Sequence, residues 1–438
     1  MKSSLRWLNL VAVFTSILGA RAAHATQPLS AFLERAASQS YDSRESAATF
    51  RQREAESDAA LGRLLPALSA RGVYTRNQYE AAFRPPIVMN GNVVEGPSVV
   101  IQKKNQLDGY LQADVPILDL SSYHRYRSQR ALSQAASEQQ TVTAQDVGRS
   151  VAQGYFQFIG SAAVARSARL SVESAEANLK NVEARRSAGV ATDLDRERAV
   201  ANLERARQDV ADAELAADLA ARSLETLSGL APTPAEDFAI DDLQEEAPLE
   251  RWQALAANSA QGRSARSLED AARESQKAAS RALVPTLAAT AQEHFSNAGG
   301  FSGHSAVYTI QLVAAVRLDY ATLANNRAQE VAAEVQGIRA ERTQRAVLDA
   351  TYTAFRRVQT GIVKSRSARA QAAAARRAAE LAADRYTAGA ATQLDVTLAQ
   401  RDAFLADAAR IQADADLALW RVQLRLAVGQ SPTSGRTP

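Results

Sequence analysis

The chain has 438 residues, no cysteine and a formal net charge of +3. Lys2, Arg6 and Arg21 account for that charge, so the chain beyond residue 25 is close to neutral and lacks the basic footprint of a nucleic-acid-binding protein. The absence of cysteine excludes disulfides, thiolate metal sites and a lipid anchor on cysteine.

The first 25 residues predict an export signal. Lys2 and Arg6 precede an apolar stretch, residues 7–18, and Ala23-His24-Ala25 places small residues where a signal peptidase reads, so we expect cleavage after Ala25. The alternative is an N-terminal anchor helix, but the stretch is shorter than the roughly 20 residues that span a bilayer, and Arg21 interrupts it. We therefore predict a signal peptide over residues 1–25.

The rest of the chain contains a long internal repeat. Residues 185–195 (RRSAGVATDLD) reappear as residues 385–395 (RYTAGAATQLD), and each copy continues into a predicted helix that ends at a glycine, Gly229 or Gly429. Such a repeat predicts a pseudo-symmetric architecture and argues against a catalytic domain with appendages. The predicted divisions are a first structural repeat, residues 26–231, an inter-repeat segment, residues 232–250, and a second structural repeat, residues 251–438.

Each repeat contains a predicted pair of β-strands. Apolar and polar residues alternate through residues 106–117 and again through residues 308–318, which gives each strand one lipid-compatible face and one polar face. Each strand has an upstream partner, at about residues 66–79 and 285–295, and the loops between partners are rich in turn-forming residues such as Asn90-Gly91. The sequence therefore predicts two β-hairpins.

Four strands cannot close a β-barrel, because the smallest single-chain outer-membrane barrels have about eight. An open sheet edge is not tolerated within a bilayer. If the hairpins are embedded in a membrane, the barrel must be shared among several chains.

Two very long helical regions are predicted from the distribution of proline. None occurs between Pro116 and Pro232 or between Pro285 and Pro432, and both intervals are rich in the helix-favouring residues Ala, Arg, Glu and Gln. As one continuous path, residues 123–186 would reach about 95 Å, so neighbouring helices must support them along their length.

Heptad spacing predicts how these helices pack, because small and apolar residues recur in steps of four and three. The first seam comprises Ala199, Leu203, Ala206, Val210, Ala213, Ala217, Ala220, Leu224 and Leu227. The second comprises Ala399, Ala403, Ala406, Arg410, Ala413, Leu417, Trp420, Leu424 and Ala427, in which only Arg410 breaks the pattern. The many alanines allow close helix axes. An ordinary soluble helical bundle is the alternative, and the strands argue against it.

The two repeated turns carry the candidate functional residues. Each turn has a glycine where a helix end needs a positive φ angle, a threonine where the next helix needs an N-cap, and an aspartate three residues later. These are Gly189, Thr192 and Asp195 in the first turn and Gly389, Thr392 and Asp395 in the second. One interpretation is that each aspartate only completes a capping box. The other is that threefold symmetry makes it a ring of carboxylates facing a tunnel.

Together, these features resemble the TolC-type outer membrane factors, the outer-membrane channels of tripartite efflux pumps and type I secretion systems. The resemblance rests on the export signal, the duplicated strands and long helices, the Val115-Pro116-Ile117-Leu118-Asp119 junction and two Gly-x-x-Thr-x-Leu-Asp turns. It implies a mainly α fold with β: a long coiled-coil α-helical barrel, and four strands per chain contributed to a trimeric, twelve-stranded transmembrane β-barrel. It also implies that the acidic segment 232–250 lies in an equatorial band around the tunnel, and a solvated linker is the alternative.

The resemblance further implies a passive exit duct in the outer membrane of a Gram-negative bacterium, extending into the periplasm and opened at its periplasmic end. The implied partners are two further copies in a homotrimer, outer-membrane lipid, a periplasmic adaptor (membrane fusion) protein and an inner-membrane transporter. A periplasmic coiled-coil scaffold or adaptor is the alternative. Adaptors, however, lack this global duplication and usually carry a lipoyl-like β segment, which the sequence does not contain.

The resemblance also assigns roles at the two turns. The implied periplasmic gate comprises Asp195, Asp395, Tyr386 and Leu398, and the implied helix-turn tip that contacts the adaptor comprises Gly189, Thr192, Leu194, Gly389, Thr392 and Leu394. The family pattern has an arginine where this chain has Ala391 and a second acidic ring where it has Leu398. We therefore expect the constriction to be partly hydrophobic.

Nothing in the sequence predicts an enzyme, a cofactor or a metal site. The four histidines, His24, His124, His294 and His304, have no metal-ligand spacing, and GxSxG, P-loop and HExxH motifs are absent. The remaining aromatic clusters are expected to pack in the core where the helices change partners, and a ligand-binding box is the alternative. They are Tyr155, Phe156 and Phe158 in the first repeat and Tyr352 and Phe355 in the second.

Overall fold

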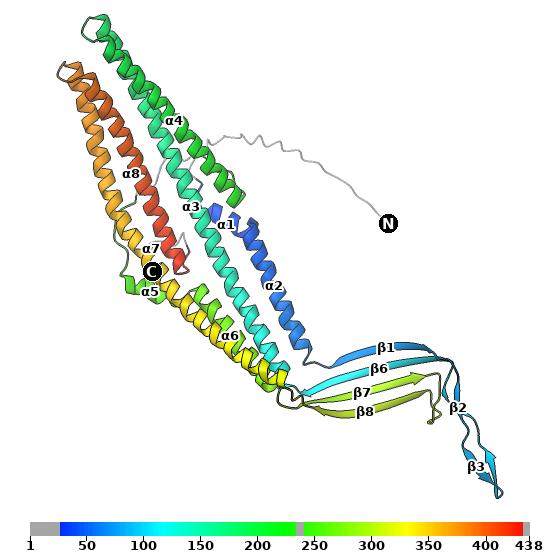
Figure 1. Cartoon of the computed structure of the whole chain (residues 1–438). Coiled ribbons are helices and arrows are strands. Elements are labelled where there is room, and N and C mark those ends of the chain that lie inside the picture. The colour runs from blue at the N-terminus through cyan, green and yellow to red at the C-terminus, as the bar shows by residue number, and fades with distance from the viewer. Residues whose placement is uncertain (1–26, 234–240, 432–438) are drawn as a thin grey trace, which may run out of the picture.

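The computed structural model describes residues 27–233 and 241–431. It is elongated, with a long helical body joined at one end to a four-stranded sheet that bends away from it (Figure 1). The predicted signal peptide and its cleavage site after Ala25 lie outside the described residues. Within the described ranges, none of the helices has the length and apolar character needed to span a membrane.

The helical body consists of two long helices and the shorter helices that pack along them. The helices are α1 (Leu29–Gln39), α2 (Tyr41–Gly62), α3 (Leu120–Ser187), α4 (Asp193–Ser228), α5 (Leu249–Ala256), α6 (Ala260–Arg281), α7 (Tyr320–Thr387) and α8 (Gln393–Ala427). α3 and α7 each contain 68 residues. At the rise of an α-helix each is about 100 Å long, which confirms the prediction of long continuous helices.

The two halves are built alike. α3 turns into α4 as α7 turns into α8, while α2 packs along α3 and α6 along α7 (Figure 1). The N-caps of α3 and α7 also correspond. The Asp119 carboxylate accepts a hydrogen bond from the Ser122 amide at 2.8 Å, and the Asp319 carboxylate accepts one from the Thr322 amide at 2.8 Å. The predicted internal duplication is therefore present in three dimensions.

α3 lies between the other helices. It packs against α2, α4, α6 and α8, whereas α7 packs against α5, α6 and α8. α7 therefore lies on one side of the body, and α2 and α4 lie on the other (Figure 1).

The strands of both repeats join into one antiparallel sheet. β1 (Ala67–Arg76), β6 (Asn105–Leu118), β7 (Thr286–Ser296) and β8 (Ala306–Ala315) have the order β1-β6-β7-β8. Val316 and Leu318, predicted to continue the last strand, lie beyond its end. The first connecting loop, expected to be rich in turns, also contains four short strands: β2 (Ala81–Phe83), β3 (Pro86–Met89), β4 (Asn92–Glu95) and β5 (Val99–Gln102).

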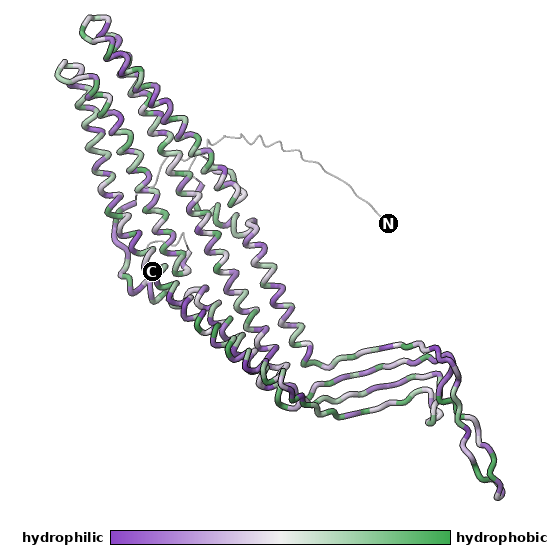
Figure 2. Tube along the Cα trace, in the orientation of Figure 1, coloured by the Kyte–Doolittle hydropathy of each residue, from purple (hydrophilic) through white to green (hydrophobic). Residues whose placement is uncertain are grey.

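The sheet has one exposed apolar face and one polar face. Leu107 of β6 is 58% exposed and Ile310 of β8 is 73% exposed. On the opposite face, the His294 imidazole lies 3.0 Å from the Asp108 carboxylate and stacks on the Tyr110 ring. Figure 2 shows the alternation of apolar and polar residues along these strands. The predicted period-two pattern is confirmed, and the apolar side chains point away from any core.

The predicted heptad seam is largely buried in α4 but only partly buried in α8. In α4, Ala199, Leu203, Ala206, Ala213, Ala220 and Leu224 are buried, while Leu227 at the end of the seam is exposed. In α8 only Ala406, Leu417 and Leu424 of the predicted seam are fully buried. Arg410 is accommodated because its guanidinium contacts the carboxylates of Asp407 and Asp414 at 3.0 and 3.4 Å.

Equivalent aromatic residues mark the cores of the two repeats. Tyr155 belongs to a buried cluster with Phe32, Phe158 and Leu224, and Phe355 belongs to another with Trp252 and other residues of the second repeat. Tyr352, predicted to pack in the core, is instead 50% exposed, because it lies beside the buried stripe of α7, which contains Val347, Thr351, Phe355 and Val358. That prediction was wrong for the single chain.

Candidate functional site

The candidate site is the end of the helical body farthest from the sheet, where both helix hairpins turn (Figure 1). In the first turn, the Gly189 amide bonds the Arg186 carbonyl at 2.9 Å and the Val190 amide bonds the Arg185 carbonyl at 2.9 Å, which closes the C-terminus of α3. Gly189 has a φ angle of 74° and Gly389 one of 76°. A Cβ atom would meet nothing within 4 Å at either position, so the backbone angle, and not lack of space, requires glycine.

Both predicted capping boxes are present. The Asp195 amide donates to the Thr192 hydroxyl oxygen at 3.2 Å, and the Thr192 amide donates to the Asp195 carboxylate at 3.0 Å. Thr392 and Asp395 repeat the arrangement at 3.2 and 2.8 Å. Hydrogen bonds from the threonine amide and then its hydroxyl lower the pKa of Asp195 and the pKa of Asp395 below the ordinary aspartate value.

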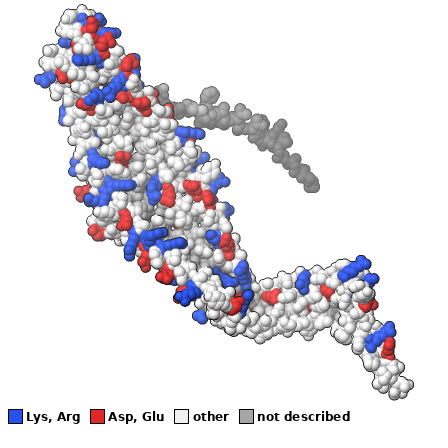
Figure 3. Space-filling model, viewed as in Figure 1, with Lys and Arg blue, Asp and Glu red and all other residues white. Residues whose placement is uncertain are grey.

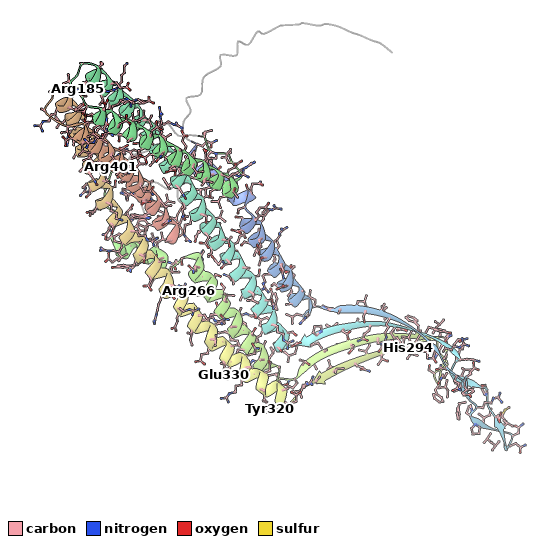
Figure 4. The ribbon with its side chains drawn as sticks, turned by 45° about the horizontal axis from the view of Figure 1, so that its top comes forward. Arg185, Arg266, His294, Tyr320, Glu330 and Arg401 are labelled. Atoms are coloured by element: carbon pink, nitrogen blue, oxygen red, sulfur yellow. The ribbon has the colours of Figure 1, made fainter. Side chains whose placement is uncertain are left out.

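Tyr386 lies between the two hairpins and is only 6% exposed. It packs with Val182 of α3, Ala199 of α4 and Val396 of α8, and Ala391 packs against the same cluster. The Arg185 guanidinium lies over the Tyr386 ring, 4.8 Å from its centroid, and donates to the Thr387 carbonyl at 2.8 Å. Figure 4 shows Arg185 at this end of the body, opposite His294 in the sheet.

Electrostatics link Tyr386 to the first turn. Burial, and secondly the negative charge of Asp195, raise the pKa of the Tyr386 hydroxyl. By geometry that hydroxyl has no hydrogen-bond partner among the described residues, although the nearby Arg185 guanidinium acts against the rise in its pKa. Tyr386 therefore acts in the protomer as a buried aromatic surface between the hairpins.

The other predicted site residues lie on the surface of this end. Leu194, Leu394 and Leu398 are exposed, and so is Asp395, whereas Asp195 is partly buried. Leu398 is not part of the Tyr386 cluster. Each aspartate accepts a hydrogen bond from its own threonine hydroxyl. Asp195 also lies near enough to Tyr386 to affect the pKa of its hydroxyl.

Sequence reasoning did not find Arg185. The arginine occurs in both repeats, as Arg185 and Arg385, but only the tertiary arrangement places the first copy against the tyrosine of the second repeat. It also missed the ion pair between Arg186 and Asp193, at 2.6 Å, which lies within the first turn.

A second charged cluster holds the inter-repeat segment to α8. The buried Arg421 guanidinium bonds both carboxylate oxygens of Asp241, at 2.7 and 3.0 Å, and also contacts Glu246. Burial lowers the pKa of Arg421, but the hydrogen bonds that its guanidinium donates to Asp241 and Glu246 outweigh this effect, so the pKa is raised. The described part of the acidic segment is thus anchored to the body. Glu236 and Asp237 lie outside the described residues.

Among the described residues, no group of three or more His, Cys, Asp or Glu side chains is arranged to hold a metal ion. At the tip Arg185 donates to a backbone carbonyl and Arg186 pairs with Asp193, and in the second cluster Arg421 binds Glu246.

The sequence matches the model of the family described as outer membrane efflux protein, over residues 32–230 and again over residues 252–430. The chain belongs to the outer membrane efflux protein family. The double match follows the internal repeat, and it confirms the resemblance to the TolC-type outer membrane factors. No curated protein matches the sequence.

Solved structures of the same family share the fold. The crystal structure of CusC, a protein that forms a transmembrane channel, is similar with a TM-score of 0.79 and 17% identity over 92% of each chain. The outer membrane channel CmeC of Campylobacter jejuni gives 0.77 and 16% identity over 93% of this chain and 87% of CmeC. The open state of the MtrE channel of Neisseria gonorrhoeae gives 0.74 and 18% identity over 94% and 92%.

Proposed function

We propose that three copies of this chain form the exit duct of a tripartite efflux pump or type I secretion system in the outer membrane of a Gram-negative bacterium. The observation that carries the proposal is the sheet. Its exposed face is apolar, and in the described residues β1 pairs only with β6 and β8 only with β7, so both outer edges lack partners. In lipid such edges must be paired, and β8 of one copy pairs with β1 of the next.

Three sheets of four strands give a closed barrel of twelve, above the minimum of about eight. The helical bodies then continue the barrel into the periplasm over roughly 100 Å. The free sides of α7 and of α2 with α4 supply the contacts between neighbouring copies. The duct is passive, because the work of transport is done by an inner-membrane transporter.

At the periplasmic end, Asp195, Asp395, Tyr386 and Leu398 form the gate. Threefold symmetry places three copies of each carboxylate around one opening, where they attract cations, and Leu398 adds an apolar margin. The capping boxes keep the aspartates ionised at neutral pH, because their hydrogen bonds stabilise the charged form. Capping and gating are therefore compatible roles of the same side chains.

The two turns, with Gly189, Thr192 and Leu194 in one and Gly389, Thr392 and Leu394 in the other, dock a periplasmic adaptor protein. Support comes from their exposed apolar side chains, Leu194 and Leu394, held at corresponding places by rigid caps. Adaptor binding opens the gate when it separates the hairpins that Tyr386 and Arg185 hold together.

The alternative is a periplasmic scaffold or adaptor with a soluble sheet. The exposed apolar strand faces disfavour it, because a soluble sheet covers its apolar face. Reconstitution of the purified protein into planar bilayers tests the proposal. A duct inserts and conducts ions, whereas a scaffold stays soluble without detergent and gives no conductance.

A further inference from the structure

The loop between β1 and β6 ends in a β-hairpin that is apolar on both faces. In it Ile87 lies opposite Val94, and Val88 lies opposite Val93. Directly opposed residues share a face, so the two pairs occupy opposite faces of the hairpin. All four are exposed in the single chain, Val88 by 71% and Val93 by 73%. A two-stranded hairpin without a covered face is marginally stable in water, so this one needs a partner surface.

The hairpin is built as a defined element. Asn90 and Gly91 have positive φ angles of 54° and 84°, as a two-residue turn between paired strands requires. At its base, the Gly96 amide donates to the Pro85 carbonyl at 2.7 Å, and Arg84 pairs with Glu95 at 3.1 Å. The apolar faces are thus presented on a fixed support.

Contacts at the base direct the hairpin toward one edge of the sheet. The Gly300 amide, in the β7–β8 loop, donates to the Val100 carbonyl of β5 at 3.1 Å. The Phe83 ring of β2 meets the Phe301 ring of the same loop edge to face, with centroids 5.9 Å apart. The loop from the β1 side therefore crosses the end of the sheet, and in Figures 1 and 4 the hairpin projects on the β8 side.

Charged residues separate the hairpin from the apolar part of the strands. Arg76 ends β1, and Lys103 and Lys104 precede β6, so basic side chains gather at the bend between sheet and hairpin (Figure 3). Such residues mark the headgroup level of a bilayer, beyond its hydrocarbon. The hairpin lies past this level, which argues against lipid chains as its cover.

We infer that the hairpin packs on the neighbouring copy of this chain, the copy whose β1 pairs with β8. The inference rests on the shared barrel proposed above. The neighbour presents its own β1–β6 loop at this position, with Tyr79 exposed by 72% and Phe83 by 46%. Each copy then contacts the next through its hairpin, which gives a closed ring of three contacts outside the membrane and separate from the pairing of β8 with β1. We call this contact between the hairpin and the neighbouring loop the clasp.

Crosslinking tests the clasp, because the chain has no cysteine of its own. A chain with Val88→Cys is co-expressed with a tagged chain carrying Tyr79→Cys, and the purified protein is treated with a short bis-maleimide. We expect a tagged crosslinked dimer that requires both cysteines. As the control for the barrel itself, Gln311→Cys in β8 is paired with Ser69→Cys, Arg71→Cys or Val73→Cys in β1, all on the polar face of the sheet.

The control separates the two claims. If a seam pair crosslinks and the Val88–Tyr79 pair does not, the clasp is wrong and the shared barrel stands. If no seam pair crosslinks, the shared barrel is wrong and the clasp fails with it. A second measurement uses Val88→Glu with Val93→Glu, which should dissociate the trimer in SDS at a lower temperature. The apolar control, Val88→Ile with Val93→Ile, should leave that temperature unchanged, and equal temperatures for both variants would overturn the clasp.

Discussion

Arg185 and Tyr386, one from each repeat, join the two helix hairpins at their turns, with the guanidinium carbon 4.8 Å from the ring centroid. The same guanidinium donates to the Thr387 carbonyl at 2.8 Å. Because α3 and α4 carry one side of this contact and α7 and α8 the other, it is a direct brace between the halves of the tip. Its removal should therefore loosen the end of the duct.

Arg185→Ala should raise the resting conductance of the channel. The substitution removes a cation–π contact of about 0.5–1 kcal/mol and a hydrogen bond of about 1 kcal/mol, which together shift a two-state tip about 10-fold to 30-fold toward its open form. Single-channel recording measures the change. Arg186→Ala is the matched control, because Arg186 pairs with Asp193 within its own turn. Equal effects of both substitutions would show that Arg185 is no brace.

Asp395→Ala should reduce cation selectivity and block by a trivalent cation added from the periplasmic side, with the barrel unchanged. Three carboxylates around one opening attract cations, and their removal abolishes that attraction. If Asp395 only caps the helix, its removal would cost roughly 1 kcal/mol of local helix stability and would leave ion selectivity unchanged. Recording in planar bilayers distinguishes the two roles. If the variant keeps wild-type selectivity and wild-type block, Asp395 serves only as a helix cap.

The pH dependence of the same recordings follows from the lowered pKa of Asp395, caused by hydrogen bonds from Thr392. A lowered pKa keeps the carboxylate ionised above the ordinary aspartate value of about 3.9, and both its charge and its capping bonds are lost as pH falls through the lowered pKa. Cation selectivity should therefore persist from neutral pH to about pH 4 and disappear below it. Loss already near pH 6 would contradict this assignment.

Gly389→Val should reduce export while the trimer still assembles. The φ angle of 76° is costly for a residue with a side chain, by about 1–2 kcal/mol, and most so for a β-branched one. Gly389→Asn is the control, since asparagine tolerates this angle and should retain export. A complementation assay for export, with a gel assay for the trimer, makes the comparison. Full export by the valine variant would mean that the turn is only a connector.

The sequence predicts what is set by local spacing. Helix length, strand alternation and both capping boxes depend on residues within a few positions of one another, and the structure has all of them. Arg185 and Tyr386 are far apart in the chain, and no periodicity reports their contact. The β3–β4 hairpin was not predicted, although Asn90-Gly91 between two short apolar runs is a hairpin signal, because the loop was interpreted from its turn residues alone.

Burial of charge was also beyond the sequence. Arg421 reads as one more arginine on a charged helix, yet it is buried because Asp241 and Glu246 return from the inter-repeat segment to bind it. The prediction for Tyr352 was wrong in the opposite sense, because this residue was expected to be buried and is exposed. The sequence alone does not show whether an aromatic residue on a long helix faces the core or the solvent.

Arg421→Ala should lower the thermal stability of the detergent-solubilised protein substantially. Removal of one partner leaves the carboxylates of Asp241 and Glu246 without their cation, at a cost of about 3–5 kcal/mol for a buried pair. Arg401→Ala removes an exposed partner of Asp402 and should change stability by no more than about 0.5 kcal/mol. Circular dichroism during heating compares them. Similar melting temperatures would show that the contacts of Arg421 with Asp241 and Glu246 contribute little to stability.

The shared barrel is tested most directly by the mass of the protein purified in detergent. Among the described residues the outer edges of β1 and β8 lack partners, and in the proposed barrel neighbouring copies pair them. Light scattering with the detergent contribution subtracted, or native mass spectrometry, should give three chains per particle, and heating in SDS should dissociate them to single chains. A stable particle containing one chain would contradict the account.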